Sequence, residues 1–463
     1  MAKQARFLEG NLFRHITVMS LTSSLGLMAI FAVDFIDMIF IAMLGKAELA
    51  AAIGYAGAIL FFTSSFGIGM AIASGALVAR ALGSGDALLA RRRATTALVY
   101  SIFFGALFAG AVWINLRPLA SLVGASGLTL DLAVLYLSII IPSLPLLVVG
   151  MVGGAILRAH GAARKAMLVT ITGGVINAVL DPILIFGLDM ELAGAAWASV
   201  AARVGIAVSA FLPILREHGG LTRPTPEALA KDFRPILMIA FPAILTQLAT
   251  PVGQAYVTRA MAEFGEAAVA GMAIVGRMTP LAFGVLFALS GAVGPIIGQN
   301  SGAGKTDRVA RAYRDALLFT AGITLLNSLI LFLLREPIAA LFDAQGITRE
   351  LVFLFCGPLA LAFFFNGMIF VSNAAFNNLG HPFQSTWINW GRHTLGTIPL
   401  VMIFAAWLGA PGVQIGQAAG GVFFGLAALW LANRVIRSGM AKPDPREPFF
   451  RQSRLFQMLY HRR

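Results

Sequence analysis

The sequence predicts an all-α integral membrane protein with twelve transmembrane helices, arranged as two six-helix bundles related by a parallel internal repeat. Hydrophobic residues make up 58% of the 463 residues and charged residues only 12%, whereas a typical soluble domain carries roughly a quarter charged residues. The mean hydropathy is +0.83. A chain so poor in charge cannot cover a surface that faces water, so most of its surface must face lipid.

Apolar stretches of about 20 residues recur along the whole chain, and each is long enough to cross a hydrocarbon core of roughly 30 Å. The 49 glycines and 20 prolines fit helices that approach one another closely and bend. We predict twelve spans, at 16–43, 51–79, 94–116, 132–157, 166–186, 194–214, 236–258, 278–297, 315–334, 351–376, 386–408 and 413–433.

The distribution of basic residues predicts the orientation. With the N-terminus inside, 26 of the 34 Lys and Arg residues lie on the cytoplasmic side and six lie outside, as the positive-inside rule requires. Only Arg203 and Arg392 fall within spans. The net charge of +13 is therefore a topology signal with lipid head groups as its partner, and no nucleic acid is needed. We expect a multi-pass protein of the cell (inner) membrane with both termini cytoplasmic.

The chain contains an internal repeat. "LGKAELAAAIGYAG" (44–57) aligns with "FGEAAVAGMAIVGR" (264–277), and residues 66–86 align with 283–305. Six helices in each half make the repeats parallel, which is typical of alternating-access transporters. The predicted segments are an N-terminal lobe (1–215) that carries the ion site, a cytoplasmic linker (216–234), a C-terminal lobe (235–440) and a basic cytoplasmic tail (441–463).

The stretch "GQNSGAGKT" (298–306) resembles a phosphate-binding loop but lacks its spacing. Such a loop needs a glycine five residues before its Gly-Lys pair and a short buried strand before it. Gln299 stands at that position, and the stretch follows a long apolar run. The repeat makes it the counterpart of residues 83–86, a helix end and loop. We therefore predict no ATP site, no cofactor and no enzymatic activity.

Three acidic residues lie well within predicted spans, namely Asp34, Asp37 and Asp181. A charge at mid-membrane costs about 2.5–3.5 kcal/mol on insertion scales, so such residues usually have a function. The alternative is structural pairing with basic groups, but the first six spans hold only Arg203. Burial favours the neutral form of a carboxyl group, so these side chains suit the uptake and release of a proton.

The spacing of these residues places them in two groups. Asp34 and Asp37 are three apart, and Asn177 and Asp181 are four apart, so each pair shares a helix face. Pro182 removes a backbone donor and bends the helix directly after Asp181. The second half has no matching acids, so we predict an ion site in the N-terminal bundle alone. We interpret Arg392 as a hydrogen-bond donor between helices.

Several motifs resemble those of the multidrug and toxic compound extrusion (MATE) family. "VDFIDMIFIAMLGKAELAA" resembles its helix 1 signature, and "NAVLDPILIFG" and "VGPIIGQNSGAGKTDRVARA" resemble later landmarks in the same order. The resemblance covers nearly the whole chain. It implies twelve helices in two lobes and export of drug-like, often cationic or amphipathic compounds in exchange for H⁺ or Na⁺.

The resemblance also implies which residues form the ion site. Asp37 matches the helix 1 acid, Asn177 and Asp181 match a helix 5 pair, and Ser199 takes the place of a helix 6 hydroxyl. Asp34 is an additional acid, which we treat with Arg392 as a possible accessory residue. The absence of acids in the second lobe places the chain closest to the DinF-like branch.

Two other classes stay open at this point. A lipid-linked oligosaccharide flippase of the same superfamily would need a cationic cavity, for which only Arg203 and Arg392 are available. A membrane protein without transport activity would have no need for acids within its spans. The predicted partners are a small organic substrate, a coupling ion and the bilayer, and we expect a monomer.

Overall fold

The structure is a computed structural model that describes residues 5–438, except for the side chains of residues 34, 38, 42 and 47. The described residues are almost entirely helical and include no β-strand. This confirms the predicted all-α class. The predicted basic tail at 441–463 lies outside the described residues.

The first half of the chain contains six long membrane segments and one short helix, α4, between the third and fourth of them. Its elements are η1 (Arg6–Leu8), α1 (Leu12–Met43), α2 (Ala47–Gly83), α3 (Ala87–Ile114), α4 (Leu116–Leu122), α5 (Gly127–Ile140), η2 (Ile141–Ser143), α6 (Leu144–Ala159), α7 (Ala163–Pro182), η3 (Ile183–Gly187) and α8 (Glu191–Glu217).

The second half repeats this order of long helices. Its elements are α9 (Pro226–Ala262), α10 (Glu266–Gly302), α11 (Thr306–Leu341), α12 (Gly346–Leu354), η4 (Phe355–Leu359), α13 (Ala360–Asn378), α14 (Pro382–Gly391), η5 (Arg392–Gly396), α15 (Thr397–Leu408) and α16 (Ala410–Ser438).

Eleven segments of the described chain are long and apolar enough to cross a membrane. The twelfth is the predicted span 386–408, which the structure divides into α14, the π-helical turn η5 and α15. No single piece of it reaches the length of a span, but the chain continues as one helical segment. The protein thus has the predicted twelve transmembrane segments, and most of them are longer than the apolar stretches alone indicate.

Corresponding segments of the two halves are interrupted at corresponding places. The fourth segment of the first half breaks at η2, which contains Pro142, and the fourth segment of the second half breaks at η4, which contains Pro358. Each fifth segment contains a π-helical turn, η3 or η5. Proline removes a backbone donor, and π-turns often occur at functional sites. These shared interruptions support the internal repeat that the sequence predicts.

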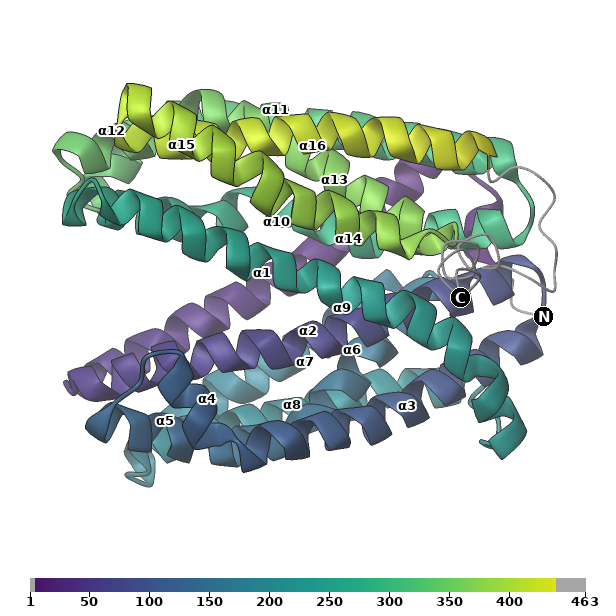
Figure 1. Cartoon of the computed structure of the whole chain (residues 1–463). Helices are drawn as coiled ribbons and strands as arrows, with labels where there is room; N and C mark the ends of the chain where they lie inside the picture. Colours follow the sequence, from purple (N-terminus) through teal and green to yellow (C-terminus); the bar gives the residue numbers. More distant parts are fainter. Residues whose placement is uncertain (1–4, 439–463) are drawn as a thin grey trace, which may run out of the picture. The chain divides into compact units, whose positions relative to one another are not determined.

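Contacts divide the chain into two compact units. Of the described residues, one unit takes in 5–6 and Leu25–Ile244, and the other takes in Phe7–Ser24 and 245–438. In the first unit α2 packs against α6, and α7 against α8; in the second, α16 packs against both α13 and α15 (Figure 1). These boundaries differ from the predicted lobes in two places, because the first turns of α1 and of α9 each pack with the other half.

The predicted linker 216–234 is largely structured. Helix α8 continues to Glu217, and α9 begins at Pro226. The carboxylate of Asp232 is 1% exposed and accepts two hydrogen bonds from Arg92, at 2.9 and 3.1 Å, and one from Thr96 at 3.1 Å. Charge-assisted hydrogen bonds of this kind are among the strong ones. They hold the start of α9 against α3 and explain why it belongs to the first unit.

The end of α10 and the start of α11 hold the N-terminal segment in the second unit. The Phe7 amide donates to the side-chain oxygen of Gln299 (2.8 Å), and the Phe7 carbonyl accepts from Asn300 (3.1 Å) and Arg308 (3.0 Å).

The turn after α10 contains a glycine, as does the corresponding turn of the first half. Gly304 has a φ of +67°, and Gly85 has a φ of +80°. Glycine accommodates such left-handed conformations without strain. Both stretches end a helix, as the repeat predicts.

Candidate functional site

The predicted ion site brings together side chains from α1 and α7. The Nδ2 atom of Asn177 donates one hydrogen bond to Asp37 Oδ2 (2.8 Å) and one to Asp181 Oδ2 (2.7 Å). An asparagine amide carries two hydrogens, so it can serve both acceptors at once. The structure therefore joins three of the four predicted residues in one cluster within the first unit.

The cluster is largely hidden and leaves acceptor atoms without partners. Asp181 is 1% exposed and Asn177 is 6% exposed, whereas Asp37 is half-buried. The second carboxyl oxygens, Asp37 Oδ1 and Asp181 Oδ1, are sealed and have no hydrogen-bond partner among the described residues. An unpaired buried acceptor costs free energy. A proton or a small cation placed between these oxygens would remove that cost.

The two carboxyl groups are also near enough to bond to each other when one of them carries a proton. If both were ionised, they would repel each other, and the single Asn177 amide would have to offset this repulsion. The geometry is therefore suited to a site that holds at least one positive charge or proton.

The local sequence explains the position of Asp181. Asn177 and Asp181 lie one turn apart on the buried face of α7, in accordance with their spacing of four residues. Pro182 ends the regular hydrogen-bond pattern, and the chain continues as the π-helical turn η3, in which the Leu188 amide donates to Ile183 (2.9 Å). Helix α7 is thus interrupted directly after its acid.

Ser199 lies one step away from the carboxyl cluster. Its side chain lies near the hydroxyl of Tyr136 in α5, and Tyr136 in turn lies near Asp37 and Asp181. Tyr136 is 8% exposed. Sequence reasoning missed this tyrosine. Its hydroxyl within an apolar span is a signal, since a buried tyrosine usually finds a polar partner, but that signal does not indicate which partner.

The remaining predicted residues have different positions. The side chain of Asp34 lies outside the described residues. Arg203 donates from Nη1 to the Ile140 carbonyl (2.9 Å) and to Ser143 Oγ (3.0 Å). It therefore holds α8 against the break between α5 and α6, which is a structural role.

The interpretation of Arg392 as a donor between helices is wrong. Within residues 5–438 its guanidinium group has no hydrogen-bond acceptor and no carboxylate as a partner. Its neighbour His393 is 4% exposed, and its Nδ1 atom is sealed without a partner in the described chain. The second unit thus carries basic groups in its fifth segment, where the first unit carries Asp181.

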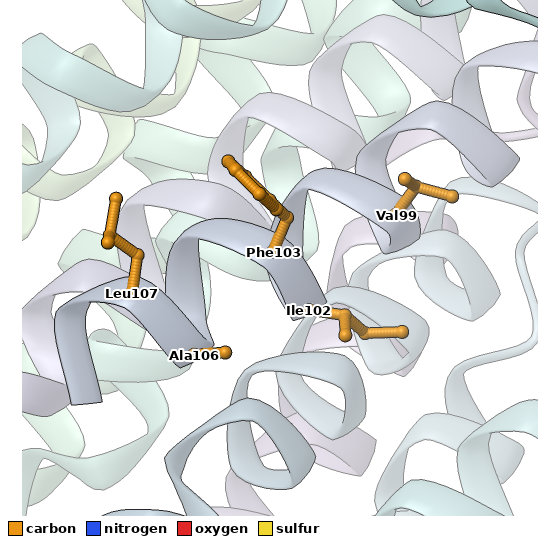
Figure 2. A pocket seen from close by; sticks show the side chains of 5 residues that line it. All are labelled: Val99, Ile102, Phe103, Ala106 and Leu107. Carbon is orange, nitrogen blue, oxygen red and sulfur yellow. The ribbon is translucent and has the colours of Figure 1, made fainter. Parts of the chain in front are cut away.

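A shallow hollow on α3 is not a binding site for a polar cargo. Figure 2 shows its lining, in which five apolar side chains all come from this one helix. Among them Phe103 is 60% and Leu107 is 63% exposed. Binding sites normally have a few polar groups that orient the ligand. We assign this surface to contact with lipid tails.

The fold and the buried carboxyl cluster define a polytopic membrane transporter, and comparisons with known proteins agree. The MatE family model matches residues 22–183 and 242–419. A curated FAD transporter of Shewanella oneidensis is 30% identical over 424 residues, which covers 90% of this chain and 93% of the relative. The probable multidrug resistance protein NorM of Thermotoga maritima is 25% identical over 75% of this chain and 76% of its own.

Solved structures share the fold. A crystal structure of a mutant of the MATE transporter VcmN from Vibrio cholerae matches with a TM-score of 0.87 and 25% identity, over 92% of this chain and 97% of that one. An outward-facing multidrug resistance MATE transporter matches with a TM-score of 0.88 at 22% identity, over 96% of this chain and all of that one. The chain belongs to the MATE family of membrane transporters.

Proposed function

We propose that this protein is a secondary active antiporter that exports organic compounds in exchange for protons by alternating access. The observation that carries the proposal is the pair of carboxyl groups, Asp37 and Asp181, joined by the amide of Asn177. Membership of a multidrug efflux family supports the export of xenobiotic compounds.

The chemistry of the pair explains the choice of the proton. A proton on one carboxyl group supplies the hydrogen bond that joins it to the other and removes the repulsion between two like charges. Release of that proton restores the repulsion and favours a change in the positions of α1 and α7. Sodium is the alternative coupling ion, because the unpartnered oxygens Asp37 Oδ1 and Asp181 Oδ1 are of the type that hard cations prefer.

The remaining parts of the proposal concern location and assembly. The excess of basic residues on one side supports an inner-membrane protein with both termini in the cytoplasm. We propose a monomer without a nucleotide cofactor, of the DinF-like branch. A flippase for lipid-linked oligosaccharides is less well supported, because it would have no use for a carboxyl pair buried in the first unit.

Two classes of cargo are supported by different observations. Relatives described as multidrug export proteins support drug-like, cationic or amphipathic compounds. The relative described as an FAD transporter supports a second candidate, an organic anion. The guanidinium group of Arg392, which has no partner among the described residues, favours this second candidate, since it would repel a cationic cargo.

The test is efflux from proteoliposomes that contain the purified protein. One series has a pH gradient alone, a second has a sodium gradient alone, and a third has ATP without either gradient. Proton antiport requires efflux in the first series and none in the third. Efflux under a sodium gradient alone would show that sodium, and not the proton, is the coupling ion. Efflux that needs only ATP would overturn the proposal.

A further inference from the structure

The two arginines within the predicted apolar spans differ in their bonding. Arg203 in the first unit makes hydrogen bonds to the Ile140 carbonyl and to Ser143 Oγ, and these bonds account for its presence there. Arg392 in the second unit is half-buried and has no such partner among the described residues. A charge in the membrane interior is costly, so one that has no structural partner indicates a function.

Three elements of the second unit meet around the Arg392 side chain. A Cβ atom on Gly421 of α16 would lie 3.9 Å from Arg392 Nε and 3.0 Å from Asn366 Oδ1 of α13. The absence of a side chain at Gly421 thus lets these two polar groups pack against the backbone of α16. The Asn366 Oδ1 atom is itself buried and has no hydrogen-bond partner in the described chain. Arg392 and Asn366 are therefore polar groups with unused bonding capacity that flank one glycine.

The guanidinium group of Arg392 carries the positive charge at this position. His393 follows Arg392 directly, and it packs against Gly253 of α9, where a Cβ atom would lie 2.3 Å from His393 Nδ1. In the part of the chain that the structure describes, no carboxylate forms an ion pair with Arg392. A ligand that approached this position would meet a cation with no competing carboxylate.

We propose that Arg392, with Asn366 beside it, binds a phosphate or carboxylate group of an anionic cargo. The planar guanidinium group offers several N–H donors in a geometry that matches such oxyanions. The side-chain amide of Asn366 carries two further N–H donors. This inference rests on the proposed transport function and specifies the cargo as an organic anion.

This proposal also explains why the fifth segments of the two units carry opposite charges. The first unit carries acids in its fifth segment, at Asp181 before the π-turn η3, and the second carries Arg392 at the start of the π-turn η5. The negative site is suited to the coupling proton, and the positive site to the anionic cargo. The two ligands of an antiporter would thus be bound by corresponding segments with opposite charge.

The experiment uses the full-length protein in lipid nanodiscs and compares two fluorescent probes. Riboflavin and flavin mononucleotide have the same ring and differ by one phosphate group, so the difference in their affinities isolates the phosphate. We expect wild-type protein to bind the mononucleotide more tightly. Arg392→Gln should remove about tenfold or more of that preference, as expected for a charge-assisted pair, and Arg392→Lys should retain part of it.

The controls separate the site from general charge and from folding. Arg311→Gln removes one positive charge from an exposed position of the same unit and should leave the preference unchanged. Unchanged riboflavin binding by Arg392→Gln shows that the variant is folded. If Arg392→Gln does not fold, the reduced preference of Arg392→Lys decides the question. Equal affinities of wild-type protein for the two probes, or no binding of the mononucleotide, would overturn the inference.

A lipid phosphate could occupy the same position, and a second arm distinguishes it from cargo. The measurements are repeated in phosphatidylcholine alone and with added phosphatidylglycerol. If Arg392 serves an anionic lipid, phosphatidylglycerol will bind in an Arg392-dependent way while the flavin preference is absent, and the cargo assignment is then wrong. Proton-driven efflux of a cationic dye by a protein without flavin preference would overturn this inference and leave the proposed antiport intact.

Discussion

The amide nitrogen of Asn177 in α7 lies 2.8 Å from a carboxylate oxygen of Asp37 in α1, 140 residues away in the sequence. The same nitrogen lies 2.7 Å from Asp181. One side chain thereby couples two acids that come from different helices. The charge of this small cluster depends on the protons it binds, which gives the following predictions their basis.

Asp37→Asn and Asp181→Asn should each reduce proton-driven efflux at least about tenfold, because either change keeps the shape of the side chain and removes a titratable group. Proton release on cargo addition should be lost in parallel, with the protein still monodisperse. Asp34→Asn is the control and should have a smaller effect, because Asp34 is not part of the family pattern. Normal proton-driven efflux by both variants would exclude the site.

Asn177→Ala should weaken the coupling of efflux to protons and lower the free energy of unfolding by about 1–3 kcal/mol, because it leaves two buried acceptors without their shared donor. Ser199→Ala is the matched control, since Ser199 lies near Tyr136 rather than next to the carboxyl pair. Its effects on coupling and on stability should be smaller than those of Asn177→Ala. The ratio of protons to cargo and the thermal unfolding of the purified variants provide the test. A milder effect at Asn177 than at Ser199 would contradict the bridging role.

Arg308→Ala should destabilise the second unit by about 1–3 kcal/mol. Its guanidinium group donates to Asn300 Oδ1 (3.0 Å) and to the Phe7 carbonyl (3.0 Å), both in partly buried contacts, and such charged donors are among the stronger ones. Lys305→Ala removes only one exposed bond, to Leu8, and should leave stability and transport unchanged. Equal melting temperatures of the two variants would show that the N-terminal contact contributes nothing.

Cysteine accessibility tests the orientation. In a Cys356→Ala background, Asp189→Cys between η3 and α8 should react with an impermeant thiol reagent from outside the cell. Thr306→Cys, at the start of α11, should react only from the cytoplasmic side. Position 189 lies at the C-terminal end of its segment, and position 306 lies at the N-terminal end of its own. The excess of basic residues on one side predicts which of these ends faces the cytoplasm. Labelling in the reversed pattern would invert the assigned topology.

The pair His160 and His218 predicts a loss of stability in acid. Their rings lie 4.6 Å apart, and burial above all lowers the pKa of His160 from 6.5 to about 4. Burial also lowers the pKa of His218, with a smaller effect of Lys165. Between pH 6.5 and about 4 the unfolded chain binds more protons than the folded one, so stability falls as the pH falls through this window.

The measurement is the melting temperature of the purified protein between pH 7 and 5. The melting temperature should decrease less between pH 7 and pH 5 in His160→Gln than in the wild-type protein. His15→Gln, which changes a histidine in the other unit, should keep the wild-type slope. Equal slopes in the wild-type protein and His160→Gln would contradict the assigned pKa shift.

The sequence by itself determined the membrane class, the twelve segments and the repeat, and it pointed to the acids proposed for the ion site. These features depend on local composition and on spacing along one helix, and both are visible without the fold. Asn177 and Asp181 share a face of α7 simply because they are four residues apart. The end of α10 at Gly302 and the turn at Gly304 follow in the same way from the glycines of that stretch.

Tertiary structure decided which of these residues meet. The bond of Asn177 to Asp37 joins segments that are far apart in the chain, and no local pattern encodes such a pairing. Arg203 and Arg392 show the same limit, because both are single arginines in apolar spans. Arg203 donates to the Ile140 carbonyl 63 residues away, whereas the described residues offer Arg392 no acceptor, since the available acceptors depend on how the neighbouring helices pack.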